Sequence, residues 1–459
     1  MIADQSFKKY MEEAIGSENA LVAFSAFDEP ASVSVRLNPF KGTSGPQGRE
    51  VSWCRYGRIL EERPVFTLDP LFHAGAYYVQ DSSSMFVGYA FREFLKDFPK
   101  PASRPLRVLD LCAAPGGKTT DLASSLREAC GDDFLLVANE VMKARVGVLA
   151  DNVAIWGDPN VVVTTDDPRA FQALPGFFDI VVTDVPCSGE GMFRKDEEAQ
   201  RQWSEDNVAL CESRQRRILA DVWPALRQEG ILIYSTCTFN RLENDGNVAW
   251  IEAELGAVCQ TKEDVMGHKQ GVLKTDMGYS LVPGLVEGEG QYCAVLRKTS
   301  DVVFRDVRSG GRKPAPKVKG NPVPKEAASL VSVPVVLRLR GNTVVAVPDR
   351  IASEVEMIEQ ELHVVAAGSA LGTLKGNVLV PDADLSLSMI LSDEAYPSVE
   401  VDRQTALAFL HRDNVVFPEA PKGYLLVRYQ GHPLGFVKNL GNRCNSLHPQ
   451  SRRIRMEIR

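Results

Sequence analysis

The sequence predicts an α/β protein built around a doubly wound, Rossmann-like sheet, and two observations carry this prediction. From about residue 79 to residue 300, apolar runs of strand length alternate with helical stretches, a pattern typical of βαβ units and a parallel sheet. A Gly-rich turn and two short cysteine motifs each follow one of these runs. Because ligands of such sheets bind beyond the carboxyl ends of the strands, the pattern also predicts a functional site there.

The composition is that of an ordinary globular protein. The chain has 459 residues, 44% hydrophobic and 24% charged, which is enough for two to four domains. Its net charge of −8 argues against a protein that coats nucleic acid nonspecifically, but it leaves room for a local basic groove. No apolar run is long enough to span a bilayer, and the N-terminus has no apolar signal core. We therefore expect a cytoplasmic monomer that does not bind a membrane.

Cysteine and histidine usage argues against metal sites and disulfides. The chain has nine cysteines, an odd number, without any Cys-x-x-Cys spacing, and only six histidines. Neither a zinc site nor a disulfide framework is therefore expected. The default interpretation of these thiols is a small buried hydrophobe, and it applies to Cys130, Cys211, Cys259 and Cys293.

Residues 1–78 are expected to form a small α+β domain. A helical opening covers Gln5–Ile15. The segment Ser32–Leu37 alternates polar and apolar residues, as a half-buried strand does, and Asn38-Pro39 ends it.

Residues 79–300 are expected to form the domain with the parallel sheet. Its predicted strands are Arg107–Leu111, Phe134–Ala138, Val161–Thr164, Ile180–Thr183, Ile231–Tyr234 and Tyr292–Leu296. Its predicted helices are Thr119–Ala129, Lys143–Trp156, Asn207–Arg227 and Glu243–Glu254.

The remaining chain divides into a basic linker, residues 301–325, and a β-rich region, residues 326–459. Between Arg305 and Lys319 the linker places six lysines and arginines among glycines and prolines, as either a solvated tether or a phosphate-binding arm does. Short apolar runs in the β-rich region indicate one or two small modules: Val331–Leu339, Thr343–Val347, Val378–Pro381, Tyr424–Tyr429 and Gly435–Lys438. Four arginines stand near the C-terminus: Arg452, Arg453, Arg455 and Arg459.

The Gly-rich turn is a candidate cofactor site. It opens a helix and consists of Cys112, Ala113, Ala114, Pro115, Gly116, Gly117 and Lys118. Small residues let backbone N–H groups approach a ligand, and a helix N-terminus favours negative charge. Glu140, after the next strand, can bind ribose hydroxyls, and Asp167 can accept the adenine amino group, with Asp166 as the competing choice. Without phosphate-loop spacing, a nucleoside triphosphate is disfavoured.

Cys187 and Cys237 are candidates for thiolate chemistry beside this cofactor. Cys187 lies in Thr-Asp-Val-Pro-Cys-Ser-Gly-Glu-Gly, which also holds Asp184, and Cys237 lies in Tyr-Ser-Thr-Cys-Thr-Phe. A lone cysteine of this kind is more often a buried spacer. Two cysteines in adjacent strand-end loops, one preceded by Asp-x-Pro, favour chemistry instead.

These strings resemble the RNA cytosine-C5 methyltransferase family of the Sun (Fmu) type, which uses S-adenosylmethionine. The matching strings are the two cysteine motifs and Asp-Leu-Cys-Ala-Ala-Pro-Gly-Gly-Lys-Thr. Met192–Asp196 and Tyr429–Gly435 resemble the branch called ribosomal RNA small subunit methyltransferase F. The resemblance is strong from about Phe72 to Leu296 and implies a PUA-like RNA-binding module in the C-terminal region.

The resemblance also implies roles for individual residues. Cys112 to Lys118 would surround the methionine part of S-adenosylmethionine, Glu140 the ribose and Asp167 the adenine. Cys237 matches the family nucleophile and Cys187 the cysteine of product release, while Asp184 would lie between cofactor and base. One departure is Pro283-Gly284, where the family often has Pro-His, which leaves a substrate-contacting histidine in doubt.

The chemistry of cytosine agrees with these roles. Its carbon 5 is a poor nucleophile until a thiolate adds to carbon 6 and turns the ring into an enamine. A protonated carboxyl at Asp184 could then offset charge that develops on N3. The target base must be unstacked to reach the pocket.

The implied substrate is RNA, with ribosomal RNA on the small subunit as the first choice. The alternatives are a transfer RNA cytosine-C5 methyltransferase, a DNA cytosine methyltransferase and a non-catalytic RNA-binding assembly factor. The DNA enzymes attack with the Pro-Cys cysteine, so Cys187 would then be the nucleophile and the Tyr-Ser-Thr-Cys motif would be unexplained. Intact Cys187, Cys237 and Asp184 disfavour an inactive factor.

Overall fold

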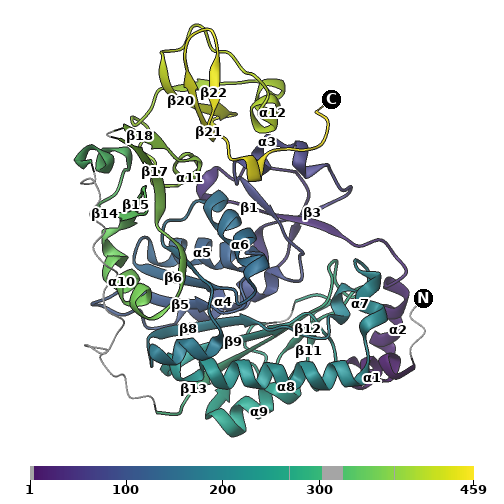
Figure 1. Ribbon diagram of the computed structural model, residues 1–459. Coiled ribbons are helices and arrows are strands. Elements are labelled where there is room, and N and C mark those ends of the chain that lie inside the picture. Colours follow the sequence, from purple (N-terminus) through teal and green to yellow (C-terminus); the bar gives the residue numbers. More distant parts are fainter. Residues whose placement is uncertain (1–4, 268, 302–323, 377, 459) are drawn as a thin grey trace.

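The computed structural model describes residues 5–267, 269–301, 324–376 and 378–458 (Figure 1). Almost all of the expected basic linker, and Arg459, lie outside these residues. Short 3-10 helices occur throughout, namely η1 (Pro39–Lys41), η2 (Phe66–Leu68), η3 (Pro168–Ala173), η4 (Glu190–Met192), η5 (Trp223–Ala225), η6 (Lys325–Leu330), η7 (Asp349–Ile351) and η8 (Gln450–Arg452).

The N-terminal part pairs helices with a small sheet. The helices are α1 (Gln5–Ile15), α2 (Ser17–Ala26) and α3 (Pro70–His73), and the strands are β1 (Val33–Leu37), β2 (Arg49–Val51), β3 (Cys54–Leu60) and β4 (Tyr77–Val79). The sheet order is β2-β3-β1-β4. In α1, Phe7, Met11 and Ile15 are buried at the four-residue spacing of one helix face. The predicted opening helix and first strand are both confirmed.

The centre of the molecule is a ten-stranded mixed sheet. Its order is β11-β12-β13-β9-β8-β5-β6-β7-β16, with β10 beside β13. The strands are β5 (Leu106–Asp110), β6 (Phe134–Asn139), β7 (Val161–Thr164), β8 (Phe178–Asp184), β9 (Leu226–Thr236), β10 (Ala257–Cys259), β11 (Leu273–Lys274), β12 (Tyr279–Leu281), β13 (Gln291–Lys298) and β16 (Val364–Ala367). Strands β5 to β9 are parallel, which confirms the doubly wound prediction.

Two features of the sheet differ from a simple parallel sheet. Strand β13, predicted as Tyr292–Leu296, runs antiparallel to β9. Strand β16 comes from the C-terminal region and pairs antiparallel with β7, so the sheet draws its last strand from beyond the linker. The order reverses between β5 and β8, and this topological switch point is where α/β sheets bind ligands.

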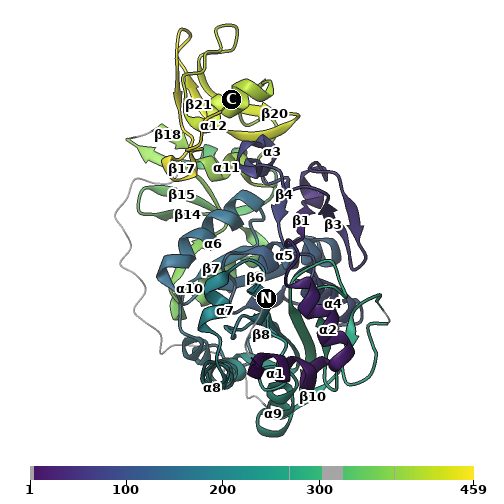
Figure 2. The ribbon, with the colours of Figure 1, turned by 90° about the vertical axis from the view of Figure 1, so that its right-hand side faces the viewer.

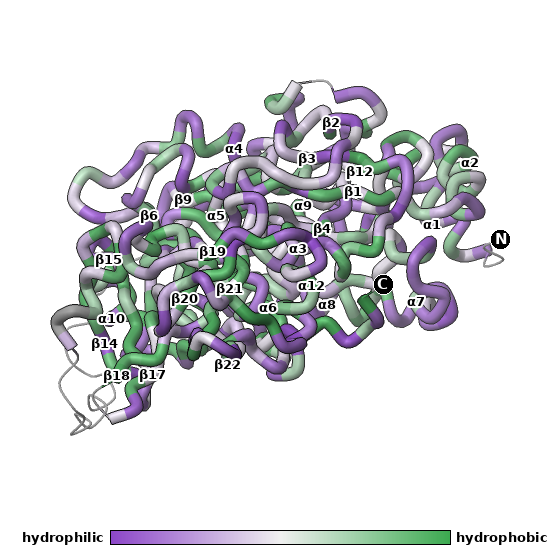
Figure 3. Tube along the Cα trace, turned by 90° about the horizontal axis from the view of Figure 1, so that it is seen from above, coloured by the Kyte–Doolittle hydropathy of each residue, from purple (hydrophilic) through white to green (hydrophobic). Residues whose placement is uncertain are grey.

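Helices cover both faces of this sheet. They are α4 (Met85–Lys96), α5 (Gly117–Cys130), α6 (Lys143–Trp156), α7 (Glu197–Gln202), α8 (Glu205–Val222), α9 (Asp245–Leu255) and α10 (Ala352–Glu361). One core cluster joins α4, α5 and α6 to the sheet, and a second joins α8, α9 and α10 to the opposite face. In Figure 3, α7 at the outer edge is hydrophilic, as its sequence Glu-Glu-Ala-Gln-Arg-Gln requires.

The C-terminal region contains two further four-stranded sheets. The first has the order β14-β15-β17-β18 and the second β19-β20-β21-β22. Their elements are β14 (Val335–Arg340), β15 (Thr343–Pro348), β17 (Ser369–Lys375), β18 (Val378–Pro381), α11 (Ala383–Leu387), β19 (Ser398–Glu400), α12 (Arg403–His411), β20 (Gly423–Tyr429), β21 (His432–Asn439) and β22 (Cys444–Ser446). Figures 1 and 2 show the second sheet stacked above α3 of the N-terminal part. None of the helices in the described ranges is long and apolar enough to cross a membrane.

Candidate active site

The Gly-rich turn follows β5 and leads into α5 at the switch point. The Ala113 N–H donates to the Asn139 carbonyl oxygen at 2.8 Å, which joins the turn to the end of β6. Gly116 has a φ of 112°, a conformation that favours glycine. No side chain caps the helix that begins at Gly117, so its first N–H groups can bind a carboxylate.

Glu140 lies at the end of β6, beside this turn, and its side chain is buried. One oxygen, Oε1, accepts a hydrogen bond from the Met142 N–H at 2.8 Å, and the other lies 3.6 Å from the Arg145 guanidinium. The loop therefore holds the carboxylate in place. Its second oxygen is bound, among the described residues, only by the long ion pair with Arg145, so it can accept a hydrogen bond from a ligand hydroxyl.

The structure distinguishes the two neighbouring aspartates after β7. Both oxygens of buried Asp166 are engaged by His363, one by its N–H at 2.8 Å and the other by Nδ1 at 2.6 Å. Asp167 is exposed; its carboxylate accepts the Arg169 N–H and lies 3.7 Å from the Arg217 guanidinium. Asp166 thus anchors the segment that leads into β16, and Asp167 remains the candidate for binding a ligand.

Asp184 ends β8 and forms an ion pair with Lys118 of the Gly-rich turn, at 2.8 Å. Its second oxygen accepts hydrogen bonds from Ser235 at 2.9 Å and Gln291 at 3.2 Å. Burial alone would raise the pKa of this carboxyl, but the Lys118 ammonium and these hydrogen bonds outweigh burial and hold the pKa below its usual value. Asp184 is therefore a carboxylate in the ligand-free protein, and a protonated Asp184 beside the bound base stays a prediction.

Asp110 is a site residue that the sequence reasoning did not single out. It is the last residue of β5, and burial raises its pKa to about 7, although its carboxyl accepts a hydrogen bond from Thr119 at 2.6 Å. The available signal was an acid at the end of an otherwise buried strand. Burial also raises the pKa of neighbouring Cys112 to about 12, so Cys112 is a neutral thiol and not a third nucleophile.

The two predicted cysteines meet. Strands β8 and β9 are parallel neighbours, with Asp184 opposite Ser235, so the loops that follow them emerge together. The Sγ atoms of Cys187 and Cys237 lie 3.1 Å apart, within hydrogen-bonding distance. The hydrogen bond to Cys237, followed by burial, raises the pKa of Cys187 well above its usual value. Cys187 therefore keeps its proton, and it can donate that proton in a hydrogen bond to the Cys237 sulfur.

Two buried glutamates that the sequence reasoning missed join the cysteine loops. Glu190 follows Cys187 and accepts the N–H groups of Phe239 at 2.7 Å and Asn240 at 3.1 Å, beyond Cys237. In the opposite direction, Glu243 of the Cys237 loop accepts the N–H of Ser188, which follows Cys187, at 3.1 Å. These crossed hydrogen bonds fix one loop against the other, so they set the distance between the two thiols.

Glycine packing brings the same loops still closer. The Gly191 N–H donates to the Cys237 carbonyl at 2.7 Å, and a Cβ at Gly191 would lie 2.7 Å from both that carbonyl oxygen and the Cα of Gly290. A side chain at Gly191 would therefore push the cysteine loops apart.

Glu243 also makes stability depend on pH. Burial first, and the charge of Glu190 second, raise its pKa to about 7. Because the folded pKa lies above the unfolded value, its stabilising effect is complete below about pH 4.5 and is lost as pH rises through about 7. We expect Glu243→Gln to lower stability by about 1–3 kcal/mol at low pH, because the new amide nitrogen faces a donor. Thermal unfolding from pH 5 to 8.5 should show this gap narrowing as pH rises.

A suitable control is Glu212→Gln, which alters a carboxylate of α8 that pairs with Arg216. The difference in stability between Glu212→Gln and the wild-type protein should not change with pH. If the stability difference between Glu243→Gln and wild type stayed constant across pH 7, the raised pKa of Glu243 would be contradicted.

The Pro283-Gly284 departure has a structural counterpart. Gly284 has a φ of 87°, and a Cβ there would lie 3.0 Å from Val22 and Ala26 of α2. The N-terminal helices thus occupy the space that a side chain at position 284 would need, and a histidine does not fit.

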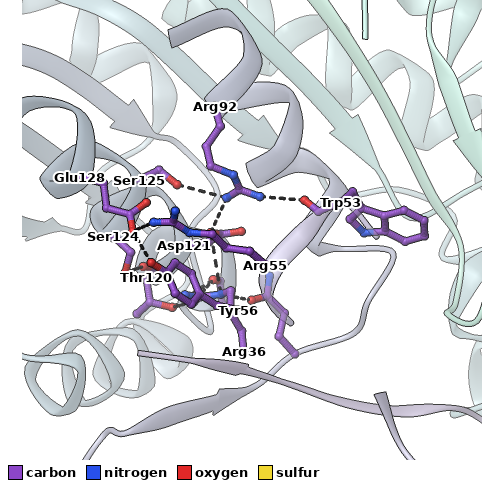
Figure 4. Close-up of polar contacts among 12 residues, drawn as sticks. Arg36, Trp53, Arg55, Tyr56, Arg92, Thr120, Asp121, Ser124, Ser125 and Glu128 are labelled. Carbon is purple, nitrogen blue, oxygen red and sulfur yellow. Dashed lines mark hydrogen bonds and ion pairs between the residues drawn. The ribbon is translucent and has the colours of Figure 1, made fainter. Parts of the chain in front are cut away.

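The N-terminal part braces the Gly-rich turn through a buried polar cluster (Figure 4). Arg36 of β1 is 1% exposed and donates to the Gly117 carbonyl at 3.2 Å and to Thr120 at 2.6 Å. Arg92 of α4 donates to Asp121 at 2.9 Å. The first turn of α5, which carries the uncapped amides, is therefore held from outside the sheet domain.

Removing the Glu140 carboxylate is expected to weaken binding of S-adenosylmethionine. Glu140→Ala should cost about 1–3 kcal/mol of binding free energy, because buried ligand hydroxyls would lose their acceptor. Isothermal titration calorimetry measures the affinity, and Glu254→Ala, at an exposed carboxylate of α9, is the control. Unchanged affinity in Glu140→Ala would remove Glu140 from the cofactor site.

Comparison with known proteins places this site in a family. Three family models match: 16S rRNA methyltransferase RsmB/F over residues 99–297, the N-terminal domain of 16S rRNA methyltransferase RsmF over 4–82, and the methyltransferase RsmF PUA domain over 396–454. Ribosomal RNA small subunit methyltransferase F of Enterobacter sp. (strain 638) is 31% identical over 97% of this chain and 94% of its own length. The chain belongs to the RsmB/F family. The Salmonella agona (strain SL483) protein of the same name is 29% identical over 97% and 95%.

Solved structures show the same fold. A methyltransferase homolog protein from Pyrococcus horikoshii aligns with a TM-score of 0.51 and 24% identity over 64% of this chain and 99% of its own. NSun6 from Pyrococcus horikoshii with SFG aligns with a TM-score of 0.53 and 18% identity over 65% and 99%. As an RsmB/F member, the chain is an S-adenosylmethionine-dependent RNA methyltransferase, which confirms the predicted family, fold class and cofactor.

Proposed function

We propose that this RsmB/F member methylates carbon 5 of a cytosine in 16S rRNA on the small ribosomal subunit. The observation that carries the proposal is the 3.1 Å contact between Cys187 and Cys237 beside Asp184. Addition of a thiolate to carbon 6 makes carbon 5 nucleophilic, and a second acid–base group must later remove the carbon 5 proton. Two adjacent thiols supply both groups.

The proposed roles of the two cysteines follow from their motifs and from their contact. Cys237 is the nucleophile, because it lies in Tyr-Ser-Thr-Cys-Thr-Phe, the motif that matches the family nucleophile, and Cys187 lies 3.1 Å from it as the second acid–base group. The Cys237 sulfur bonds to carbon 6, the ring electrons shift to carbon 5, and carbon 5 takes the methyl group. Loss of the carbon 5 proton then restores the ring double bond and expels Cys237.

The residues of the Gly-rich turn fit S-adenosylmethionine. The uncapped amides at Gly117 suit the carboxylate of its methionine part, and we assign Cys112 to Lys118 to that part. Glu140 would bind the ribose and Asp167 the adenine. When bound, the cofactor supplies an electrophilic methyl group on sulfur.

A charged Asp184 changes the role proposed for it. The exocyclic amino group of cytosine is a hydrogen-bond donor, and a carboxylate accepts from it. We propose that ionised Asp184 accepts this bond and so favours cytosine over uracil. Lys118, within 2.8 Å of Asp184, keeps it charged in the absence of substrate.

The DNA-enzyme alternative, in which the Pro-Cys cysteine attacks, leaves Cys237 without a role, although its sulfur lies 3.1 Å from that of Cys187. A non-catalytic assembly factor would have no use for paired thiols held by crossed glutamates.

Bisulfite sequencing tests the proposal directly. Purified protein with labelled S-adenosylmethionine should transfer label to 16S rRNA, and bisulfite sequencing should show one new protected cytosine. Total RNA from cells without the gene should lack that protection. Label on transfer RNA alone, or on a base other than cytosine, would overturn the proposal.

A further inference from the structure

A cleft with both polar and apolar lining separates the N-terminal part from the last C-terminal sheet, at the C-terminal end of α6. Three segments line it, namely residues 40–42, 386–393 and 428–433. Its volume of about 390 Å³ is within the range of small-ligand sites. Figures 1 and 2 both show the second C-terminal sheet beside the N-terminal part at this junction.

Basic side chains line this cleft on both sides. Lys41 of η1 comes from the N-terminal part, and Arg428 and His432 come from the β20–β21 hairpin. The two sides are close, because a Cβ on Gly42 would lie 3.8 Å from the His432 ring. The acidic neighbours are Asp393, whose side chain is 95% exposed, and Glu400, which accepts the Gly431 N–H at 3.2 Å.

Arg428 has hydrogen-bonding capacity that the described protein atoms leave unused. Its Nε is buried without a partner. Its terminal nitrogens reach only the Gly431 carbonyl at 3.4 Å and Asp393 at 3.5 Å, both long contacts. The two terminal nitrogens are held only loosely, so an anion in the cleft can bind them through shorter, charge-assisted hydrogen bonds.

Lys41 also has a hydrogen-bond donor that the described residues leave unused. Its ammonium donates to the carbonyls of Ala74 at 2.9 Å and Ile155 at 2.7 Å, and a third N–H donor remains. Burial lowers its pKa to about 7, and burial together with Lys41 also lowers the pKa of His432. The positive charge of Lys41 disfavours a second positive charge on His432. An anion bound between Lys41 and His432 would offset this repulsion.

The hairpin turn is built in an uncommon conformation. Gln430 has a φ of 49° and Gly431 a φ of 78°, and glutamine adopts this region only with strain. This turn aims His432 and Arg428 at the cleft. Tyr429–Gly435 is also the tail motif of the sequence, and the catalytic site makes no use of it.

We propose that this cleft binds a backbone phosphate of the RNA substrate and so anchors the RNA away from the reacting base. The inference rests on the RNA substrate of the proposed function. Helix α6, with 14 residues and a length of about 21 Å, begins just after Glu140 and ends beside Lys41 of the cleft. The residues that line the cleft are separate from the Gly-rich turn and from the cysteine loops, so a phosphate bound there strengthens RNA binding and leaves the chemical step unchanged.

Removing the Arg428 charge tests the proposal. RNA binding is measured without cofactor, as fluorescence anisotropy of labelled, unmodified 16S rRNA transcript across a salt series. Arg428→Gln should weaken binding about tenfold, the worth of one charge-assisted hydrogen bond. The slope of log affinity against log salt should fall by about 0.7–0.9, the value for one phosphate.

Three controls separate anchoring from damage. Arg443→Gln removes the same charge from an exposed position just before β22, outside the cleft, and should leave the slope unchanged. Arg428→Lys keeps the charge and should retain most of the slope. Affinity for S-adenosylmethionine and kcat should stay at wild-type values in Arg428→Gln, while KM for RNA rises.

An Arg428→Gln protein with wild-type affinity and salt slope would overturn the cleft assignment. So would a fall in kcat without a rise in KM. Failure of the proposed function is distinguishable, because the wild-type protein would then bind RNA without methylating cytosine.

Discussion

Cys237→Ser is expected to abolish methyl transfer, with a loss on the order of 10³-fold or more. Serine has almost the same size, so the loop between β9 and Asn240 should keep its structure. Its hydroxyl is far less ionised than a thiol near neutral pH, so it cannot add to carbon 6. Transfer of labelled methyl groups to 16S rRNA under single-turnover conditions measures the effect.

The matched control is Cys130→Ser, at the last residue of α5 and away from the paired thiols. It should retain wild-type activity, and Cys237→Ser should retain wild-type affinity for S-adenosylmethionine. Substantial methyl transfer by Cys237→Ser would remove Cys237 as the nucleophile.

Cys187→Ala is expected to methylate once and then remain covalently joined to its RNA. The pKa of Cys187 is raised first by its hydrogen bond to Cys237 and next by burial. Once the Cys237 sulfur is bonded to carbon 6, that first cause disappears, so the Cys187 thiol loses its proton to solvent more readily and the resulting thiolate can take the carbon 5 proton. Without Cys187 this proton stays, and Cys237 cannot leave.

A denaturing gel detects the trapped complex as a retarded protein–RNA band. The band should require S-adenosylmethionine, and it should vanish in the Cys187→Ala/Cys237→Ala double variant. A band from Cys237→Ala but not from Cys187→Ala would reverse the roles and favour the DNA-enzyme order of attack.

Most of the central elements could be predicted from local patterns. Helix Lys143–Trp156 and strand Val161–Thr164 have the predicted bounds, because each has strong periodicity and a clear boundary, such as Gly157 after the helix. The direction of β13 could not be predicted. An apolar run specifies a buried strand but not whether it runs parallel or antiparallel to its neighbour.

The pairing of β16 with the central sheet could not be predicted either. Val364–Ala367 is a short apolar run in the C-terminal region, yet it pairs with Val162–Thr164, about two hundred residues earlier in the chain. The domain division at residues 301–325 remains a prediction. A truncation at that point would remove an edge strand and the His363 contact to Asp166 along with the C-terminal sheets.

The sequence by itself determined the chemical groups of the site: the Gly-rich turn, the carboxylates after successive strands, and two cysteines at strand ends. Motif identity and strand periodicity are local properties, so they can be read without coordinates. Only the tertiary structure decided how these groups act together. It placed the sulfurs of Cys187 and Cys237 3.1 Å apart. It paired Asp184 with Lys118, which keeps Asp184 charged, and it engaged Asp166 in hydrogen bonds with His363. Protonation and partner choice depend on burial and on charges brought from distant parts of the chain, and those are fixed only when the chain folds.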